Sequence, residues 1–414
     1  MRTPRWLLPL FAGLLTVSTA HAGRASDAAL NALVEGAKAS HSDTMLVLRD
    51  GKVLASYNRP GETPHAIEMM SATKSLVGLA VGRLVTEGKI KSIDEPVSDF
   101  YPEWKQGQKA KITVRMLLDH TSGLQNVPNT TVEIYPAPDG IKLALAAELS
   151  SPPGTRFSYN NKAMNLLAGV IEQASGMRMD HYIERTILQP MGIPGPAWNT
   201  DGGFDHAGHP YAMAGWKATA ADAAKIGELV LADGRWHGKQ LIDPAYIRAM
   251  VGQSQPFTPS YGLLWWRRGA DRKMGVSAKA IDAMEQQGID RVGLEQLRPL
   301  VPRTFAQPSE LRPALTQALG AELPTLAKDI KAHGCGMDDL IEDRSGPIVA
   351  YEANGYLGQY IVVVPQAHLV AVRQIEADPS YDGKGPWPYG YDDFTARVIA
   401  LARTYTSDLA VPSP

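Results

Sequence analysis

Residues 69–88 read MMSATKSLVGLAVGRLVTEG. From Ser71 to Glu87 apolar side chains occupy nearly every side of a helical projection, which predicts a buried helix. Gly88 is typical of the residue that follows a helix end. Lys74 has no polar face to occupy in such a helix, and a lysine is almost never buried unless it is paired or functional. The stretch therefore predicts a core helix that also carries a candidate site.

Ser71 and Lys74 form the pattern S-x-x-K. A serine at a helix start lies at the positive end of the helix dipole, and a lysine three residues later lies on the same face. A serine hydroxyl needs a base to become a nucleophile, and an amine is a base only when burial or other charge keeps it neutral. We predict Ser71 as nucleophile and Lys74 as its base. A capping serine beside a lysine that extends to solvent is the alternative, because the pattern is common by chance.

Strand-like segments lie near both ends of the chain, and helical segments lie between them. The strand-like segments are residues 44–48, 53–57, 261–267, 348–351, 359–364 and 369–375. Asp50-Gly51 separates the first two, which is a strong signal for a hairpin. The helical segments are residues 113–119, 141–149, 163–173, 178–188, 218–231 and 391–405. This order predicts one sheet assembled from both chain ends, with a helical domain inserted.

The order of these segments also predicts how the chain divides into domains. We predict a sheet domain from residues 23–100 and 205–414 and an all-α domain at 101–204. Residues 269–345 are polar, lean toward helix and separate two strand candidates that should be neighbours. They predict a helical insertion and a candidate lid, because such insertions form surface excursions. A disordered linker is the alternative, and leucines at helical spacing (Leu311, Leu315, Leu319) favour a folded cap.

The first 22 residues have the pattern of a secretory signal. Arg2 and Arg5 precede a mostly apolar run at 6–17, and Ala20-His21-Ala22 fits a cleavage site. The alternatives are a membrane anchor and a buried first helix. We predict a periplasmic or secreted protein that has no stable membrane insertion once the signal is removed.

The composition restricts the classes of molecule that we expect the protein to bind. The chain of 414 residues carries 41 Lys and Arg against 43 Asp and Glu and has no basic run, which argues against nucleic acid. The single cysteine, Cys335, excludes an intramolecular disulfide. His206 and His209 lie in a loop without a second pair of ligands, so we expect solvent-exposed histidines and no metal. The oligomeric state stays open.

Tyr159-Asn160-Asn161 is a second candidate element, located just before a helical segment. A loop tyrosine can transfer a proton if a nearby ammonium lowers its pKa. Asn161 could orient that ammonium and hold a substrate carbonyl. The alternative is a packed tyrosine followed by a capping asparagine.

A third candidate element is Ala353-Asn354-Gly355, followed by Tyr356. Small residues before a strand allow a ligand to approach the backbone closely. Acyl transfer needs two amide donors directed at the developing oxyanion, and the amides of Ser71 and Tyr356 are candidates. A glycine-containing bulge or turn is the alternative.

In this order, Ser71-x-x-Lys74, Tyr159-x-Asn161 and the small-x-Gly strand resemble the motifs of the serine β-lactamase and penicillin-binding superfamily. Residues 112–124, ITVRMLLDHTSGL, and residues 215–234 are similar to further segments of that superfamily. The resemblance extends from about residue 40 to the C-terminus, apart from the insertion. It implies an α/β (α+β) fold, an antiparallel sheet flanked by helices with an inserted all-α domain. It also implies an acyl-enzyme on Ser71, with Lys74 and Tyr159 moving protons, Asn161 positioning, and no metal or other cofactor.

One position departs from the penicillin-recognising pattern. Those relatives usually carry Lys-Thr-Gly on the third motif, and this chain has Ala353 in place of the lysine. The pattern is more similar to family C esterases and 6-aminohexanoate-dimer hydrolases. We therefore expect an esterase or amidase for a small-molecule ester or amide, with Gly355 and Tyr356 in substrate binding. The alternatives are a β-lactamase or D,D-peptidase, and a non-catalytic protein that binds peptidoglycan or β-lactams.

Overall fold

The computed structural model describes residues 16–127, 129–271, 273–306, 308–333, 335–376, 390–407 and 409. The first 15 residues of the predicted signal lie outside the described residues. The predicted cleavage pattern at 20–22 lies within helix α1 (Thr16–Ala39). The signal thus stays a prediction.

A six-stranded sheet forms the centre of the molecule, with strand order β2-β1-β12-β11-β10-β7. Every pair in it is antiparallel. Its strands are β1 (Thr44–Arg49), β2 (Lys52–Asn58), β7 (Trp266–Gly269), β10 (Ile348–Gly355), β11 (Gln359–Val364) and β12 (Leu369–Gln374). Segments from both ends of the chain therefore meet in one sheet, which confirms the predicted fold class.

The first hairpin forms where the sequence predicts it. Asp50 and Gly51 connect β1 to β2 with φ values of 49° and 72°. Two consecutive residues with positive φ give the turn whose twist matches paired strands, and Asp-Gly is a favoured pair for it.

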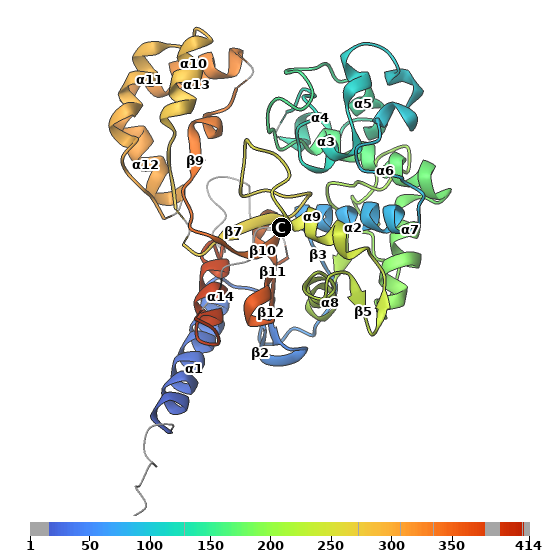
Figure 1. The fold of residues 1–414 in the computed structure, drawn as a ribbon, viewed down its shortest axis with the longest axis vertical. Coiled ribbons are helices and arrows are strands. Elements are labelled where there is room, and N and C mark those ends of the chain that lie inside the picture. The colour runs from blue at the N-terminus through green and yellow to red at the C-terminus, as the bar shows by residue number, and fades with distance from the viewer. Residues whose placement is uncertain are drawn as a thin grey trace, which may run out of the picture.

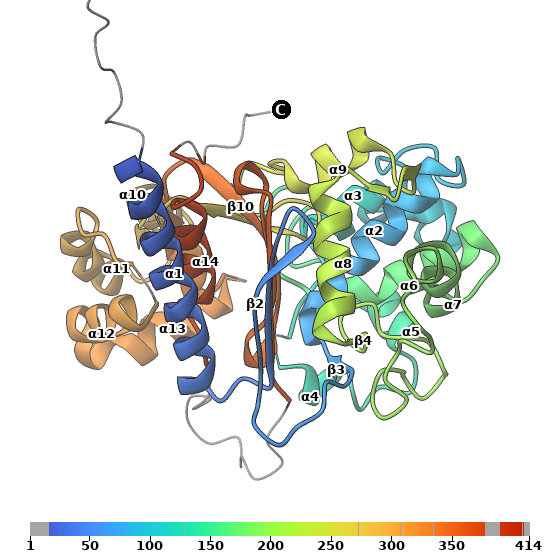
Figure 2. The ribbon, with the colours of Figure 1, turned by 90° about the horizontal axis from the view of Figure 1, so that it is seen from below.

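Helices cover both faces of the sheet (Figures 1 and 2). On one face α1 packs with α14 (Phe394–Ala402), and Leu33 and Phe394 share a buried cluster with strand residues such as Val362. On the other face lie α2 (Thr73–Thr86), α8 (Ala220–Leu231) and α9 (Pro244–Val251). The predicted buried helix is thus α2, which lies in the core of the molecule.

The helices between residues 114 and 183 form a helical layer. They are α3 (Val114–Leu118), α4 (Thr130–Glu133), α5 (Gly140–Ala146), α6 (Asn161–Ser175) and α7 (Met179–Ile183). Of these, α5, α6 and α7 lie on the side of α2 that faces away from the sheet (Figure 2). The Thr113 side chain caps α3, and Gly176 ends α6 in the left-handed region. Leu117, Leu166 and Tyr182 are buried in the same cluster as Leu76 of α2. This layer therefore shares one continuous core with the helix that carries Ser71 and Lys74.

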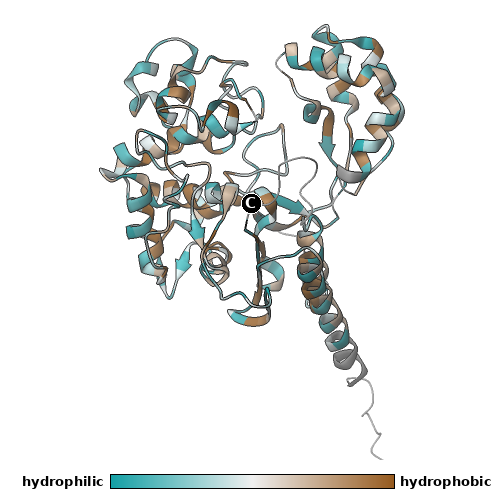
Figure 3. Ribbon diagram, turned by 180° about the vertical axis from the view of Figure 1, so that it is seen from behind, coloured by the Kyte–Doolittle hydropathy of each residue, from teal (hydrophilic) through white to brown (hydrophobic). Residues whose placement is uncertain are grey.

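Residues 270–347 form an insertion between the neighbouring strands β7 and β10. A two-stranded stalk, β8 (Met274–Val276) paired with β9 (Ile341–Asp343), leads to four helices. These are α10 (Ala278–Gln286), α11 (Arg291–Leu297), α12 (Pro308–Leu319) and α13 (Leu323–Ala332). Brown and teal alternate along them in Figure 3, and their apolar side chains form a separate buried cluster that includes Leu294, Leu326 and Ile330. The stalk is a feature that the sequence pattern did not predict.

The strand predicted at 261–267 was placed too early. Leu264 has a φ of 60°, and the Gly262 amide donates to Trp265 O at 2.8 Å, so residues 261–265 form a turn. Leu263 and Trp265 are buried against α2 in this turn. These apolar residues therefore serve to pack against α2 and do not mark a strand. Strand β7 begins only at Trp266.

Candidate active site

Ser71 lies in a short 3-10 turn, Met70–Ala72, that leads directly into α2. Met70 just before it has a φ of 49°, an unfavourable conformation for a residue with a side chain. The Met69 amide donates to Trp216 O at 2.8 Å, and Thr73 Oγ1 accepts from the Trp216 amide at 3.2 Å. These bonds fix the chain on both sides of Ser71, whose side chain is only partly buried. The candidate nucleophile is therefore held in a turn at the start of a helix and is not fully buried.

Lys74 occupies the position that the S-x-x-K spacing predicts. Its Nζ lies 2.8 Å from Ser71 Oγ and donates to Met213 O at 2.9 Å. The residue is 2% exposed, and burial lowers the pKa of Lys74 to about 7. An amine with this pKa is neutral in a large fraction of molecules at neutral pH, so it is suited to accept the Ser71 proton.

Tyr159 lies beside this pair, in the loop before α6. Lys74 Nζ is 5.0 Å from the centre of its ring, and Tyr159 shares a hydrogen bond with Ser71. The expectation that an ammonium lowers its pKa is wrong. Burial raises the pKa of Tyr159 to about 12, because the low polarity around the phenol outweighs the Ser71 hydrogen bond. The phenol is thus protonated at neutral pH and is able to donate a proton.

Asn161 is the first residue of α6, and it is the neighbouring Asn160 that caps this helix, accepting from the Ala163 amide at 2.9 Å. From the sequence we expected Asn161 to orient the Lys74 ammonium. In the structure the Met213 carbonyl accepts that hydrogen bond instead. Within the described part of the chain, Asn161 Oδ1 is buried and has no hydrogen-bond partner.

Gly355 ends β10 beside the nucleophile turn. A Cβ on this residue would lie 2.4 Å from Met69 O and 3.1 Å from Met70 Cβ, so only glycine allows this approach. Tyr356 follows, with 64% of its surface exposed, in the short turn Tyr356–Gly358. The structure thus brings the third motif next to the residues that precede Ser71.

Aromatic side chains surround Tyr159, and most of them were not predicted as site residues. The Trp266 ring stacks on it with centroids 6.2 Å apart, and the His120 ring lies 4.5 Å away. His120 is 2% exposed, and burial together with Lys74 lowers its pKa to about 3. His120 lies in the segment LLDHTSGL, but the sequence held no signal that this histidine packs against Tyr159.

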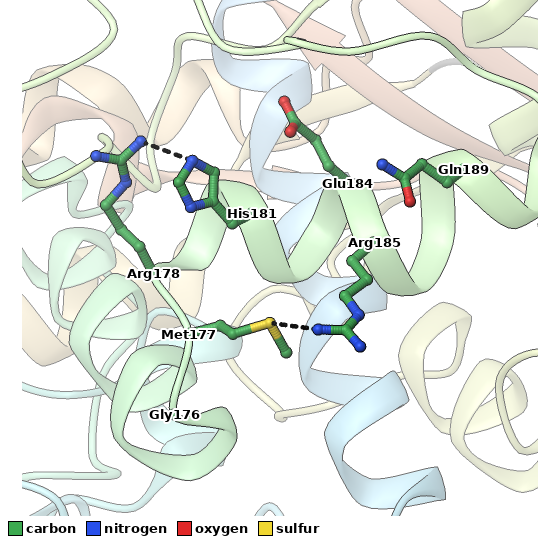
Figure 4. Close-up of a pocket in the computed structure, with 7 residues that line it drawn as sticks. All are labelled: Gly176, Met177, Arg178, His181, Glu184, Arg185 and Gln189. Carbon is green, nitrogen blue, oxygen red and sulfur yellow. Dashed lines mark hydrogen bonds between the residues drawn. The ribbon is translucent and has the colours of Figure 1, made fainter.

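Two other clusters lie apart from these motifs. One is a surface hollow of about 570 Å³. Figure 4 shows the residues that line it, which are Gly176, Met177, Arg178, His181, Glu184, Arg185 and Gln189. None of its lining residues belongs to the three motifs. His209 is half-buried and bonded to Asp205 at 3.0 Å, near Asp139, whereas we expected it to be exposed. Asp205 Oδ2 also accepts from the Gly140 amide at 2.7 Å, so this cluster serves to join two loops.

An antiparallel sheet with a helical layer, and Ser71 beside the buried Lys74 at the start of the helix between them, defines a β-lactamase/transpeptidase-like fold. The chain belongs to the β-lactamase family, whose family model, described as Beta-lactamase, matches residues 30–387. The predicted superfamily is therefore confirmed.

Curated relatives include enzymes that cleave amides and esters. The chain is 25% identical over 260 residues to 6-aminohexanoate-dimer hydrolase of Paenarthrobacter ureafaciens, a match that covers 56% of this chain and 65% of that protein. It is 28% identical over 174 residues to esterase EstB of Burkholderia gladioli, covering 37% of this chain and 44% of the esterase. These matches span less than two thirds of either relative.

Solved structures show the same fold at low identity. A penicillin binding protein from Bacillus halodurans superposes with a TM-score of 0.54 at 17% identity, over 89% of this chain and 98% of that chain. No helix among the described residues has both the length and the apolar character needed to cross a bilayer.

Proposed function

We propose that this protein is a serine hydrolase that cleaves an ester or amide bond through an acyl-enzyme on Ser71. The observation that carries the proposal is the 2.8 Å contact between Ser71 Oγ and Lys74 Nζ, with the pKa of Lys74 near 7. A buried lysine without a carboxylate is costly to a fold, and a general base with this pKa is a reason to keep it.

In the proposed acylation step, Ser71 Oγ transfers its proton to Lys74 and forms a bond with the substrate carbonyl carbon. The amides of Ser71 and Tyr356 hold the negative oxygen of the tetrahedral intermediate. The bond to the leaving group then breaks, and Tyr159 donates its proton to the leaving oxygen or nitrogen. The ammonium of Lys74 returns a proton to Tyr159, so the net transfer runs from Ser71 to the leaving group.

Deacylation follows the same route with water as nucleophile. Water gives a proton to Lys74 and attacks the acyl carbon, and the bond from that carbon to Ser71 Oγ breaks. Ser71 recovers its proton through Tyr159 and Lys74. Asn161, whose buried Oδ1 has no partner in the described part of the chain, is placed to accept a hydrogen bond from the substrate.

The substrate class follows from the third motif. Ala353 is fully buried and faces the apolar core, so the strand offers no cation at this position. The nearby Arg268 is paired with Glu352, whose Oε1 also accepts from Asn354 Nδ2 at 3.1 Å. Penicillin-recognising relatives use a cation on this strand to bind the substrate carboxylate. We therefore propose a small ester or amide without a required carboxylate, and β-lactam or D,D-peptide cleavage is the alternative.

Export is part of the proposal. The basic start, apolar run and Ala20-His21-Ala22 support a cleaved signal and a periplasmic or secreted enzyme. N-terminal sequencing of the protein recovered from the periplasm or medium tests it, and a mature start near Gly23 is the expected result. Recovery with an intact Met1 in the cytoplasm would contradict it.

The test of activity uses mature protein with Ser71→Ala as the critical variant. Ser75→Ala is the matched control, because Ser75 lies one turn further along α2 and donates to Leu264 O at 2.7 Å. p-Nitrophenyl acetate and butyrate are compared with a chromogenic cephalosporin. We expect ester turnover that Ser71→Ala abolishes and Ser75→Ala retains, with a slow cephalosporin reaction.

Two outcomes would change the proposal. Fast cephalosporin turnover would mean that Ala353 is no barrier and that the protein is a β-lactamase. No turnover of either substrate, together with no acylated Ser71 by mass spectrometry, would favour a non-catalytic binding protein.

A further inference from the structure

The turn that follows Gly355 is built around a fully buried arginine. Arg373 lies on β12 and is 0% exposed. Its Nη1 donates to Leu357 O at 2.8 Å and to Gly358 O at 2.9 Å. On its other edge, Nε donates to Ser42 Oγ at 2.7 Å and Nη2 to Ser40 O at 3.2 Å. One guanidinium thus connects the turn after β10 to the loop before β1.

A buried cation is unfavourable unless its hydrogen bonds compensate for lost water. Burial lowers the pKa of Arg373 to about 10, which still leaves it charged at neutral pH. Two of its donors are directed at the carbonyls of two consecutive residues of a single turn. A planar guanidinium can hold two acceptors in a fixed geometry in a way that a flexible ammonium cannot.

The turn needs such support because its backbone is strained. Leu357 has a φ of 69°, and Gly358 has a φ of 92°. Glycine adopts such values freely, whereas a leucine does so only when its surroundings impose them. The two carbonyls that Arg373 binds belong to these two residues. Gln359, also fully buried, adds a second tie, since its side chain bonds to both the amide and the carbonyl of Ile375.

This turn begins at Tyr356, whose amide is the proposed second oxyanion donor. Gly355 just before it lies against Met69 and Met70, next to Ser71. We therefore expect a change in the Leu357–Gly358 backbone to alter the direction of the adjoining Tyr356 amide relative to Ser71. We propose that Arg373 is a positioning residue of the oxyanion hole, which holds this turn so that the Tyr356 amide faces the Ser71 site before substrate binds. This inference rests on the proposed hydrolase function.

The proposal predicts that replacing Arg373 lowers the rate of the steps in which negative charge develops on the substrate oxygen. Removing one oxyanion donor typically lowers kcat by 10²–10³-fold, so a misdirected donor should cost about 10- to 100-fold. KM for the ester should change by less than about threefold, because the ground-state carbonyl depends little on this donor. An aryl boronic acid that adds to Ser71 and mimics the tetrahedral oxyanion should lose affinity in parallel with kcat.

The experiment compares wild type with Arg373→Met, Arg373→Lys and Tyr391→Phe. Tyr391 donates to Leu33 O at 3.0 Å on the same face of the sheet as Arg373, so its variant controls for a general loss of stability when a buried hydrogen bond is removed from that face. The measurements are kcat and KM for p-nitrophenyl butyrate, boronic acid affinity, the rate of Ser71 labelling by a fluorophosphonate, and thermal melting. We expect Arg373→Met to lose kcat and boronate affinity, Arg373→Lys to recover part of both, and Tyr391→Phe to keep both.

Arg373→Met with kcat and boronate affinity within twofold of wild type would overturn the proposal, as would an equal loss in Tyr391→Phe. If Arg373→Met does not fold, Arg373→Lys provides the same test. A wild type that is labelled by the fluorophosphonate but hydrolyses no ester would contradict the proposed function, and the labelling rates would still test Arg373. A wild type that is not labelled at all would overturn both.

Discussion

Two helical regions flank the sheet, and they relate to the site in different ways (Figure 1). The described residues of the all-α layer form no separate core, because Leu117 and Leu166 are buried together with Leu76 and Leu79 of α2. The insertion has a separate core around Leu294 and Leu326 and joins the sheet through the β8–β9 stalk. A region that shares a core with α2 can hold a side chain in fixed geometry with Ser71, whereas a region with its own core can vary without disturbing that geometry. From this difference we predict that the first region takes part in the chemistry and that the second affects substrate selection.

Removing the Tyr159 hydroxyl is the strongest test of the role given to the all-α layer. We expect Tyr159→Phe to lower kcat by about 10²–10⁴-fold, the usual range for a general acid or base, with KM little changed. Steady-state kinetics on a p-nitrophenyl ester and on an anilide measure it. The anilide should lose more, because its nitrogen must be protonated to leave.

The matched control is Tyr135→Phe, which alters a tyrosine of the same layer that is 41% exposed. Tyr159→Phe with activity near wild type on both substrates would mean that this layer only shapes the site.

The second prediction concerns pH and the shared core that buries Lys74. Because the neutral amine is the base and its pKa is about 7, we expect kcat/KM to fall about tenfold per pH unit below 7 and to level off above it. Burial causes this shift, and the contacts of Lys74 are with Ser71, Met213 and Tyr159, which lie outside the insertion, so a protein that lacks the insertion should show the same profile. A profile that is flat from pH 5 to 8 would contradict Lys74 as the base.

The same shift predicts a sign for stability. The folded protein holds Lys74 at a pKa of about 7, against 10.5 for the ordinary side chain. Between these values the unfolded chain binds more protons, so this group makes stability rise with pH from about 7 to 10.5. Lys74→Met should therefore lose activity and, below pH 7, melt at a higher temperature than wild type.

Features that depend on neighbouring residues were predicted from the sequence. The S-x-x-K spacing predicted that Ser71 and Lys74 lie side by side, and they do, because the 3-10 turn that holds Ser71 continues directly into α2 and local spacing sets the geometry. The Asp50-Gly51 hairpin and the Thr113 cap were likewise set by neighbouring residues. The sheet built from both chain ends followed from the order of strand-like and helical segments.

What the sequence did not predict depends on contacts between distant segments. Met213 accepts the Lys74 hydrogen bond through its backbone carbonyl. Every residue type has such a carbonyl, so the sequence does not reveal this contact. The direction of the Tyr159 pKa shift depends on how many apolar groups surround the phenol, and that number follows from tertiary packing. The turn at 261–265 resembles a strand because its apolar residues pack against α2. In the sequence Arg373 is an ordinary strand residue. Its role emerges only from its contact with the turn of Leu357 and Gly358 in the structure.

Deleting the insertion is the third test. The Ala270 amide donates to Pro347 O at 2.9 Å, and Gly269 pairs with Ile348, so a short glycine-containing turn can replace residues 271–346 and join β7 to β10. We expect the shortened protein to fold and to keep its Ser71 labelling rate within about tenfold, because the shared core is untouched. The ratio of kcat/KM between acetate and longer acyl esters should change.

Circular dichroism and fluorophosphonate labelling check the fold and site of the shortened protein, and an ester series checks its preference. An unchanged ester preference would remove the assignment of substrate selection to the insertion. Loss of labelling in a folded protein would show that the insertion supports the chemistry after all.

The smallest effect concerns an ion pair that links the two regions directly. Arg156, three residues before Tyr159, pairs with Asp339 of the insertion, whose carboxylate also accepts from the Gly336 amide at 2.7 Å. Both side chains are about a third exposed or less. A pair of this kind is worth at most about 1 kcal/mol, and salt weakens it further.

We therefore expect Asp339→Asn to change kcat/KM by no more than about threefold and to make the enzyme less sensitive to salt. A double-mutant cycle with Arg156→Gln, measured on kcat/KM at low and at high salt, isolates the coupling between the two side chains. Arg298→Gln, which breaks an ion-pair cluster inside the insertion, is the control for a change in its own stability. Coupling that vanishes at high salt would mean that the insertion rests on the Tyr159 loop through charge alone. A coupling above tenfold that persists in salt would place the insertion with the all-α layer as a fixed part of the site.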